Sequence, residues 1–425
     1  MEKQNYKRVL ILSNECLSAR TANGRTLANF FVGYPKECLA QFSLQSVSPD
    51  FECCEKYFCV SDGEALNAFL KGKKVGKRLT QAQETAPAAA GRARSRTALT
   101  MMLRNLAWNS GRWKKGGFSE FVRDFEPQVI LVQAGDCGFM LRLARKLAKQ
   151  YAIPLVVYNS EGYFFKKFDY FRASGIAHWV YPLFRRGFCK EFRKLMHSAE
   201  HVIYNCPALQ QDYAKYFDTP SSVLYTATRL NRTVAPHNEP LRISYLGNLE
   251  VGRHTSLIEI ANKIATIAPD VRLDVYGKMP NDQVERELTS CKQISLGGFV
   301  NYDKVTEVMH NSDILVHAEG FDDFYAKDSK YAFSTKIADS LACGNCFLVY
   351  APEDFACTRY LKEHEAAYVV SNNSELEKVL ERLIREPAAR TGYRKQADAL
   401  VLKNHQAEQN AAKFTEILNN AGAKK

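Results

Sequence analysis

The sequence predicts an α/β protein made of two tandem, doubly wound Rossmann-like domains that face a cleft. Short runs rich in Val, Ile and Leu alternate with segments of helical periodicity along the chain, which is typical of parallel sheets with helices on both faces. This alternation stops at a Thr-, Asn-, Pro- and His-rich segment, residues 226–240, and then restarts. Such a segment indicates a linker between two domains, and a chain of 425 residues has room for both.

In the N-terminal half, strands are expected wherever a short buried run is bounded by polar residues. These runs cover residues 9–12, 128–132, 154–158 and 201–204. Helices are expected between Glu15 and the break at Pro35, over residues 140–147, and after Pro207, which suits the first turn of a helix. We assign residues 1–226 to this first domain.

The second half repeats the pattern. Strands are expected at residues 241–247, 271–277, 294–298, 313–317 and 346–350. Helices are expected at residues 256–267, 305–310, 336–343, 375–386 and 406–418. We assign residues 227–395 to a second Rossmann-like domain and residues 396–425 to a C-terminal helix.

Composition narrows the class of protein. The chain has no apolar run of the roughly 18–20 residues that a membrane-spanning helix needs. The N-terminus lacks the apolar core of a secretory signal, so a cytoplasmic protein is expected, and its twelve cysteines are expected to be reduced. Cys343 and Cys346 have the spacing of half a zinc or redox site, but no second pair completes it, and packing is the preferred interpretation.

The net charge of +12 is concentrated in one stretch. Residues 71–115 contain twelve Lys and Arg side chains against the single acid Glu84, and residues 164–194 combine basic side chains with many aromatic ones. These basic, aromatic insertions suit the headgroup region of an anionic membrane. The alternative is an ordinary core whose aromatic side chains pack inward. No recognised nucleic-acid module accompanies the charge, so nucleic acid is not an expected partner.

Three separate turns of the second half carry groups suited to phosphate. Ser334 and Thr335 stand where a helix begins, and the amides of a helix N-terminus bind anions. Lys336 opposes the helix dipole there, which an anionic ligand would explain. Arg253 follows the turn that begins at Gly247, and arginine binds phosphate oxygens well.

At the third turn, Gly298, Phe299 and Val300 offer open backbone and an aromatic surface for a base. Because the carboxyl ends of parallel strands meet at one edge, these turns predict a site for a nucleoside diphosphate.

Residues 241–370 resemble the donor domain of GT-B glycosyltransferases that use nucleotide sugars. The resemblance implies that Arg253 contacts the diphosphate and that Asp339, the later acid of a Glu-x7-Glu element ending at Gly344, holds the ribose. The first acid of that element falls on Tyr331, so Glu319 or Asp322 is expected to contact the sugar instead. The form Phe333-Ser-Thr-Lys336 is similar to a group of bacterial surface-polysaccharide transferases.

The N-terminal half shows a weaker, mainly architectural resemblance. Its clearest feature is Gly24, in a first loop where the family has a small-residue turn near the donor phosphate and the acceptor. An ordinary helix start explains this glycine equally well.

The resemblance implies a chemistry in which cations stabilise the departing diphosphate. Arg253, Lys336 and the amides of Ser334 and Thr335 suit that role. If the anomeric configuration inverts, Asp136 or Glu161 is the expected general base. The chain has no Asp-x-Asp motif for a divalent ion, so we expect a metal-independent enzyme without a cofactor other than its donor substrate.

The sequence therefore predicts a peripheral glycosyltransferase at the inner face of the cell membrane. It would move a sugar from a nucleotide-diphosphate-sugar donor to a glycan or polyprenyl-linked acceptor in cell-surface polysaccharide assembly. Two alternatives stay open: a non-catalytic sugar-nucleotide or membrane-binding protein on a degraded transferase scaffold, and a nucleotide-sugar epimerase or dinucleotide oxidoreductase. The chain lacks the Gly-x-Gly-x-x-Gly fingerprint of the oxidoreductase.

Overall fold

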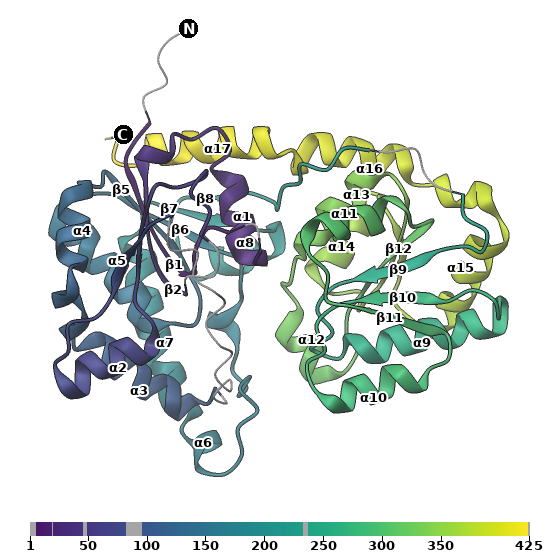
Figure 1. Ribbon diagram of the computed structural model, residues 1–425, viewed down its shortest axis with the longest axis horizontal. Coiled ribbons are helices and arrows are strands. Elements are labelled where there is room, and N and C mark those ends of the chain that lie inside the picture. Colours follow the sequence, from purple (N-terminus) through teal and green to yellow (C-terminus); the bar gives the residue numbers. More distant parts are fainter. Residues whose placement is uncertain (1–5, 19, 46–48, 82–95, 233–236, 424–425) are drawn as a thin grey trace, which may run out of the picture. The chain divides into compact units, whose positions relative to one another are not determined.

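Two sheets organise the chain in the computed structural model, which describes residues 6–18, 20–45, 49–81, 96–232 and 237–423 (Figure 1). Each sheet belongs to its own compact unit. Unit 1 comprises Met1–Leu224 and Glu408–Lys425, and unit 2 comprises Tyr225–Ala407. The chain thus passes between the units twice, and its last helix, which we expected as a separate segment, belongs to unit 1.

The sheet of unit 1 has the strand order β4-β3-β2-β1-β5-β6-β7-β8 within the described residues. All neighbouring strands are parallel except β4, which runs antiparallel to β3. The strands are β1 (Val9–Glu15), β2 (Leu39–Gln45), β3 (Lys56–Cys59), β4 (Lys77–Leu79), β5 (Val129–Gln133), β6 (Leu155–Asn159), β7 (His201–Tyr204) and β8 (Ser221–Val223).

Helices cover both faces of this sheet (Figure 1). The helices of unit 1 are α1 (Ala22–Phe30), α2 (Asp62–Lys71), α3 (Ala98–Asn109), α4 (Phe118–Phe125), α5 (Gly138–Tyr151), α6 (Ile176–Trp179), α7 (Tyr181–Ser198), α8 (Pro207–Ala214) and α17 (Ala407–Asn420). Helices α1 and α17 pack on one face, where the rings of Phe30 and Phe414 stack with centroids 5.2 Å apart. Burial of such large apolar side chains explains why α17 joins this unit.

The sheet of unit 2 is parallel throughout, with the order β11-β10-β9-β12-β13-β14 among the residues described. Its strands are β9 (Ile243–Leu246), β10 (Leu273–Tyr276), β11 (Ile294–Gly298), β12 (Ile314–Ala318), β13 (Cys346–Tyr350) and β14 (Tyr368–Val370). Its helices are α9 (Arg253–Ile267), α10 (Asp282–Ser290), α11 (Tyr302–His310), α12 (Asp323–Ser329), α13 (Thr335–Cys343), α14 (Ala356–Glu363), α15 (Asn373–Arg385) and α16 (Arg394–Leu400).

The predicted fold class is confirmed: both sheets are doubly wound, and every strand that we expected lies on an observed one. The sequence reasoning missed β2, β3, β4, β8 and β14. In β2 the buried run is interrupted by Gln41 and Ser43, which are themselves fully buried. The apolar signal of a central strand is therefore weak there.

The aromatic insertion at residues 164–194 is largely core. Phe164, Phe184, Phe188 and Phe192 are each at most 5 % exposed, and they form a chain of ring contacts that runs along α7. Their burial favours the core interpretation for these side chains. Trp179 at the end of α6 differs, because it is 80 % exposed. Arg92 and Arg94 of the other basic insertion lie outside the described residues.

No helix in the described part of the chain is long and apolar enough to cross a bilayer.

A buried histidine fastens together the two segments of unit 2 that lead toward unit 1. His405 is fully buried, with Nδ1 2.7 Å from the carbonyl of Thr226 and Nε2 2.9 Å from the hydroxyl of Tyr360. A carbonyl can only accept, so Nδ1 carries the proton and Nε2 accepts from Tyr360. The Thr228 amide donates to the His405 carbonyl at 2.9 Å. Burial lowers the pKa of His405 from 6.5 to about 4.

This pKa predicts acid sensitivity. The native state holds His405 neutral, whereas the unfolded chain takes up a proton below its pKa of 6.5. The free energy of unfolding should therefore fall by about 3 kcal/mol in total as the pH drops from above 6.5 to below 4. Urea unfolding across this range measures the slope. In His405→Gln the slope between these pH values should be smaller even if the variant is less stable; an unchanged slope would show that other groups cause it.

Candidate functional site

The loops that follow the strands of unit 2 meet backbone to backbone at one edge of its sheet. A Cβ on Gly277 would lie 2.2 Å from the carbonyl oxygen of Gly247, and one on Gly320 would lie 2.4 Å from that of Val251. Both distances are shorter than any tolerable contact, so only glycine fits. The loops after β9, β10 and β12 are therefore brought together at the carboxyl ends of the strands, where ligands bind in open parallel sheets.

The loop after β9 has unusual backbone geometry where it enters α9. Val251 and Gly252 both adopt positive φ, 54° and 76°. A β-branched residue rarely takes this conformation, and such outliers persist only where the surroundings enforce them. Here the crowding of Gly252 against Gly320 and the ring of Tyr325 supplies the constraint. The result is that α9 begins at Arg253 in a fixed orientation.

Arg253 makes a bidentate ion pair with Glu319, the residue that follows β12. Nε donates to Oε2 at 2.9 Å and Nη2 to Oε1 at 3.0 Å. The side chains are 14 % and 1 % exposed. Nε2 of His317 lies 3.2 Å from Oε1 of Glu319. Burial alone would raise the pKa of Glu319, but the charge of Arg253 and the proximity of His317 outweigh it, and its pKa is lowered.

This pair connects two residues that the sequence assigned separately to diphosphate and sugar. The sequence did not predict that Arg253 and Glu319 pair, because they are 66 positions apart along the chain. Glu319 leaves Nη1 of Arg253 as the guanidinium nitrogen not used in the two bidentate bonds. Ser256 of α9 also donates to the Glu319 carbonyl at 2.7 Å. The edge thus has a guanidinium whose position is fixed by a carboxylate.

The predicted phosphate helix is α13. Ser334 is its N-cap and accepts a hydrogen bond from the Lys336 amide at 3.3 Å, while Thr335 is its first residue. Gly344 ends it in the left-handed conformation. Asp339 lies inside the helix and is 2 % exposed, and its Oδ1 accepts from the Thr228 hydroxyl at 2.7 Å.

The end of β11 is the open part of this edge. Gly298 adopts φ 69°, and Phe299 beside it is 76 % exposed. An aromatic ring exposed at a strand end offers a surface on which a flat base can stack. Gly247 is held differently, since a Cβ there would lie 2.5 Å from the hydroxyl of Tyr245. Val300 follows Phe299 and is half-buried.

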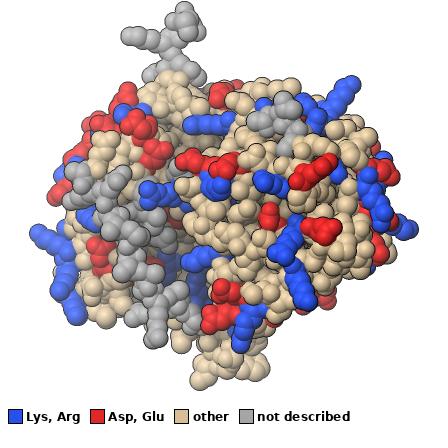
Figure 2. Space-filling view, turned by 45° about the vertical axis from the view of Figure 1, so that its right-hand side comes forward, with Lys and Arg blue, Asp and Glu red and all other residues tan. Residues whose placement is uncertain are grey.

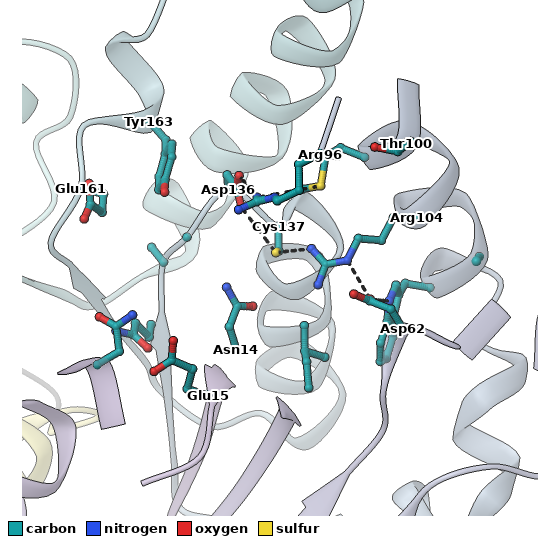
Figure 3. Close-up of a pocket in the computed structure, with 18 of the residues that line it drawn as sticks. Asn14, Glu15, Asp62, Arg96, Thr100, Arg104, Asp136, Cys137, Glu161 and Tyr163 are labelled. Carbon is teal, nitrogen blue, oxygen red and sulfur yellow. Dashed lines mark hydrogen bonds and ion pairs between the residues drawn. The ribbon is translucent and has the colours of Figure 1, made fainter. Parts of the chain in front are cut away.

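Unit 1 contains a cavity of about 650 Å³ at the carboxyl ends of its own strands (Figure 3). Its walls come from the ends of β1 and β5, from the residues after β5 and β6, and from α2 and α3. Asp136 and Glu161, the expected bases, both line it. Asn23 also lines it, whereas Gly24 is buried against the β1–α1 loop, where a Cβ would lie 2.5 Å from the Cys16 carbonyl.

Asp136 is already engaged. It is 3 % exposed, pairs with Arg96, and accepts a hydrogen bond from the Tyr170 hydroxyl at 3.1 Å. Glu161 lies on the other side of the cavity, near Tyr163 (Figure 3). The structure therefore brings both expected bases to one cavity, and it gives Asp136 an arginine partner that sequence reasoning did not foresee.

A second arginine spans the wall formed by α2 and α3. Arg104 donates from Nε to Asp62 at 2.7 Å, and its Nη1 lies 2.7 Å from Sγ of Cys137. The Trp108 indole donates to the same Asp62 oxygen at 2.8 Å. The sequence reasoning missed Asp62, Glu15 and Asn14 as lining residues. For Glu15, its position three residues after the first buried run, residues 9–12, was the available signal.

Comparisons with known proteins agree with this architecture. Anabaena HepE, solved in complex with UDP and glucose, superposes with a TM-score of 0.62 at 12 % identity, covering 97 % of this chain and 100 % of HepE. Sucrose-phosphate synthase from Thermosynechococcus elongatus gives 0.63 at 12 % identity, covering 97 % and 99 %. The lipopolysaccharide outer core galactosyltransferase WaaB gives 0.55 at 11 % identity, covering 97 % and 98 %. No match to the chain is found among curated proteins.

A family model described as "Glycosyl transferase-like" matches residues 253–416. The chain has the GT-B fold, and its residues 253–416 are similar to glycosyl transferase-like domains. The matched region of this GT-B protein begins at Arg253 and contains Glu319, Lys336 and Asp339. The resemblance to a glycosyltransferase domain seen in the sequence is therefore confirmed for residues 253–416, while the nucleotide-sugar donor and the contacts of these side chains with it stay predictions.

The buried pair predicts a large loss of stability when one partner is removed. Glu319→Gln leaves the Arg253 charge buried without compensation, and we expect the free energy of unfolding to fall by about 3–5 kcal/mol. Urea denaturation measures it. The exposed pair Lys263–Glu377, at 2.7 Å, is the control, because Glu377→Gln should cost about 1 kcal/mol or less. The double variant Arg253→Met/Glu319→Leu should be more stable than Glu319→Gln; equal costs for Glu319→Gln and Glu377→Gln would contradict the prediction.

Proposed function

We propose that this GT-B protein transfers a sugar from a nucleoside-diphosphate-sugar donor to a hydroxyl of a glycan or lipid-linked acceptor in cell-surface polysaccharide assembly. The observation that carries the proposal is the position of the glycosyl transferase-like match, which begins at Arg253, the residue fixed at the strand ends of unit 2. The solved neighbours support the donor class, because HepE was crystallised with UDP-glucose. The galactosyltransferase WaaB supports the setting, because it acts on lipopolysaccharide.

In the proposed reaction, the bond between the anomeric carbon and the diphosphate oxygen breaks, and that oxygen keeps the electron pair. Negative charge grows on the leaving group, so cations fixed in advance lower the barrier. Arg253 offers Nη1 from a position held by Glu319, and Lys336 lies in the first turn of α13. The positive end of that helix adds to the same field. Protein cations can supply this stabilisation, so transfer is expected to proceed in EDTA.

The other donor contacts follow from the same edge. Phe299 would stack on the base, with Gly298 and Val300 contributing backbone beside it. Asp339 would accept hydrogen bonds from the ribose hydroxyls. For this, either the hydrogen bond from the Thr228 hydroxyl to Asp339 must break, or the ribose and Thr228 must both donate to the carboxylate. Glu319 would contact the sugar while it orients Arg253.

The acceptor is proposed to enter the cavity of unit 1. Its mouth carries apolar side chains, since Leu66 and Leu103 line the cavity and are 39 % and 58 % exposed. Leu70 and Leu106 continue this surface along α2 and α3, with 64 % and 57 % exposed. A sugar head group in the cavity with a lipid at the mouth suits this arrangement, and favours a polyprenyl-linked acceptor over a free glycan.

The same apolar surface suggests how the protein reaches its acceptor. Helix α3 packs against both α2 and α6, and α6 exposes Ile176 and Trp179 at 78 % and 80 %. Lys and Arg are interspersed with Asp and Glu over the face drawn in Figure 2, so this face shows no single basic patch. We therefore assign membrane contact to the exposed side chains of α2, α3 and α6, with nearby Lys73 and Lys74 supplying attraction to anionic lipids.

Donor binding is testable by calorimetry with UDP. Lys336→Ala and Arg253→Ala should each weaken UDP binding about tenfold or more, because each removes a charged hydrogen-bond donor from the diphosphate. Arg286→Ala, on the exposed face of α10, is the matched control and should bind UDP as the wild type does. Arg253→Ala also unpairs Glu319, so circular dichroism must first confirm folding. Unchanged affinity in both Lys336→Ala and folded Arg253→Ala would refute the site.

Membrane contact is testable by flotation with liposomes. We expect the wild type to bind vesicles that contain anionic phospholipid and to dissociate as salt rises, because salt screens the charges. Trp179→Ser should reduce binding about tenfold, since it removes a large apolar contact with the bilayer. Tyr216→Ser, which removes an aromatic side chain 59 % exposed elsewhere on unit 1, should bind normally. Equal binding of the wild type to neutral and anionic vesicles would remove the argument.

A further inference from the structure

One carboxylate oxygen at the unit 1 cavity, Oε2 of Glu15, has no hydrogen-bond partner among the residues that the structure describes. Oε2 of Glu15 is buried, yet it makes no hydrogen bond within the described residues. Glu15 lines the cavity, and Figure 3 shows its side chain directed into it, near Asn14. A buried carboxylate oxygen without a donor is unfavourable. Such an oxygen is therefore stable only where a ligand or a water molecule donates a hydrogen bond to it.

The backbone beneath this side chain is fixed. Gln41, fully buried on β2, donates to the Glu15 carbonyl at 3.2 Å and to the Ser13 hydroxyl at 2.7 Å. Ser13 in turn donates to the same carbonyl at 2.7 Å. Three hydrogen bonds between polar groups inside the sheet hold the end of β1. The carboxylate is thus presented to the cavity from a rigid position, which suits a residue that orients a substrate.

The neighbouring acids differ from Glu15. Asp62 accepts from Arg104 and Trp108, and Asp136 accepts from Arg96 and Tyr170. These carboxylates are already satisfied by protein donors. Oε2 of Glu15 lacks such a donor among the described residues, so this oxygen is prepared to accept a hydrogen bond from a molecule in the cavity.

The charge of the lining restricts what that molecule is. Among the lining residues that the structure describes, two arginines face four carboxylates: Arg96, Arg104, Glu15, Asp62, Asp136 and Glu161. This described part of the lining therefore carries an excess of negative charge, which repels a phosphate or a uronic acid. Hydroxyl groups are attracted, because a carboxylate accepts their hydrogen bonds strongly.

We propose that Glu15 accepts a hydrogen bond from a hydroxyl of the acceptor sugar, and that the sugar in this cavity carries no negative charge. This inference rests on the proposed function, since it takes the cavity as the acceptor site. It assigns Glu15 a direct contact with the acceptor, separate from the donor contacts of unit 2. A lipid phosphate, where the acceptor has one, would then lie outside the cavity at its apolar mouth.

Two amphiphilic glycosides that differ by one carboxylate test the proposal. Binding of n-octyl β-glucoside and n-octyl β-glucuronide below their micelle concentrations is measured by saturation-transfer NMR and calorimetry. The wild type should bind the glucoside. It should bind the glucuronide at least about tenfold more weakly. Glu15→Gln should weaken glucoside binding about tenfold, because it replaces a charged acceptor by a neutral one, and should narrow the difference between the two glycosides.

The matched control is Glu52→Gln, the same change at a side chain that is 84 % exposed on unit 1, and it should bind both glycosides as the wild type does. Calorimetry with UDP on each variant separates the two proposals, because Glu15→Gln should keep the UDP affinity of the wild type. If the wild type does not bind UDP, the proposed donor site in unit 2 is wrong, but the proposed role of Glu15 in acceptor binding is not affected. No glucoside binding by the wild type, equal binding of the two glycosides, or unchanged glucoside binding in Glu15→Gln would each overturn the inference.

Discussion

The buried ion pair between Arg253 and Glu319 determines how the ligand edge of unit 2 is built. Placing two charges out of water is costly, and only close, bidentate geometry offsets the cost. That geometry requires the loops after β9 and β12 to approach within backbone contact, which Gly252 and Gly320 allow. The positive φ of Val251 belongs to the same arrangement. Charge pairing, glycine and strained backbone are therefore parts of one constraint.

A guanidinium held in this way differs from a lysine on a surface helix. Its orientation is set before any ligand arrives, so little reorganisation is needed when charge develops on a leaving group. The carboxylate that positions it also prevents it from folding back onto other acceptors. The structure thus explains how one residue of the β9–α9 turn can serve both the stability of the sheet edge and the chemistry proposed there.

Sequence patterns predicted those parts of the molecule that depend on local rules. Helix α13 follows from the Ser334 cap and the Gly344 end, and the strands with unbroken apolar runs were placed correctly. Strand β2 was missed because buried Gln41 and Ser43 interrupt its pattern. The partners of Arg253 and Asp136 could not be foreseen, because they lie 66 and 40 residues away along the chain and only the topology brings them close.

The two units use carboxylates at strand ends in opposite ways, and this contrast is informative about function. Glu319 accepts from Arg253 through both of its oxygens, so it holds a fixed charge pair, whereas Oε2 of Glu15 is buried without a donor among the described residues, so it can accept a hydrogen bond from a ligand. Both residues stand at the carboxyl end of a parallel strand. A fold that stabilises one carboxylate with an arginine could have done the same for the other by placing Arg96 or Arg104 near it, yet those arginines bind Asp136 and Asp62. The lack of a protein donor to Oε2 of Glu15, at the end of β1, therefore supports the proposal that a ligand hydroxyl donates to this oxygen.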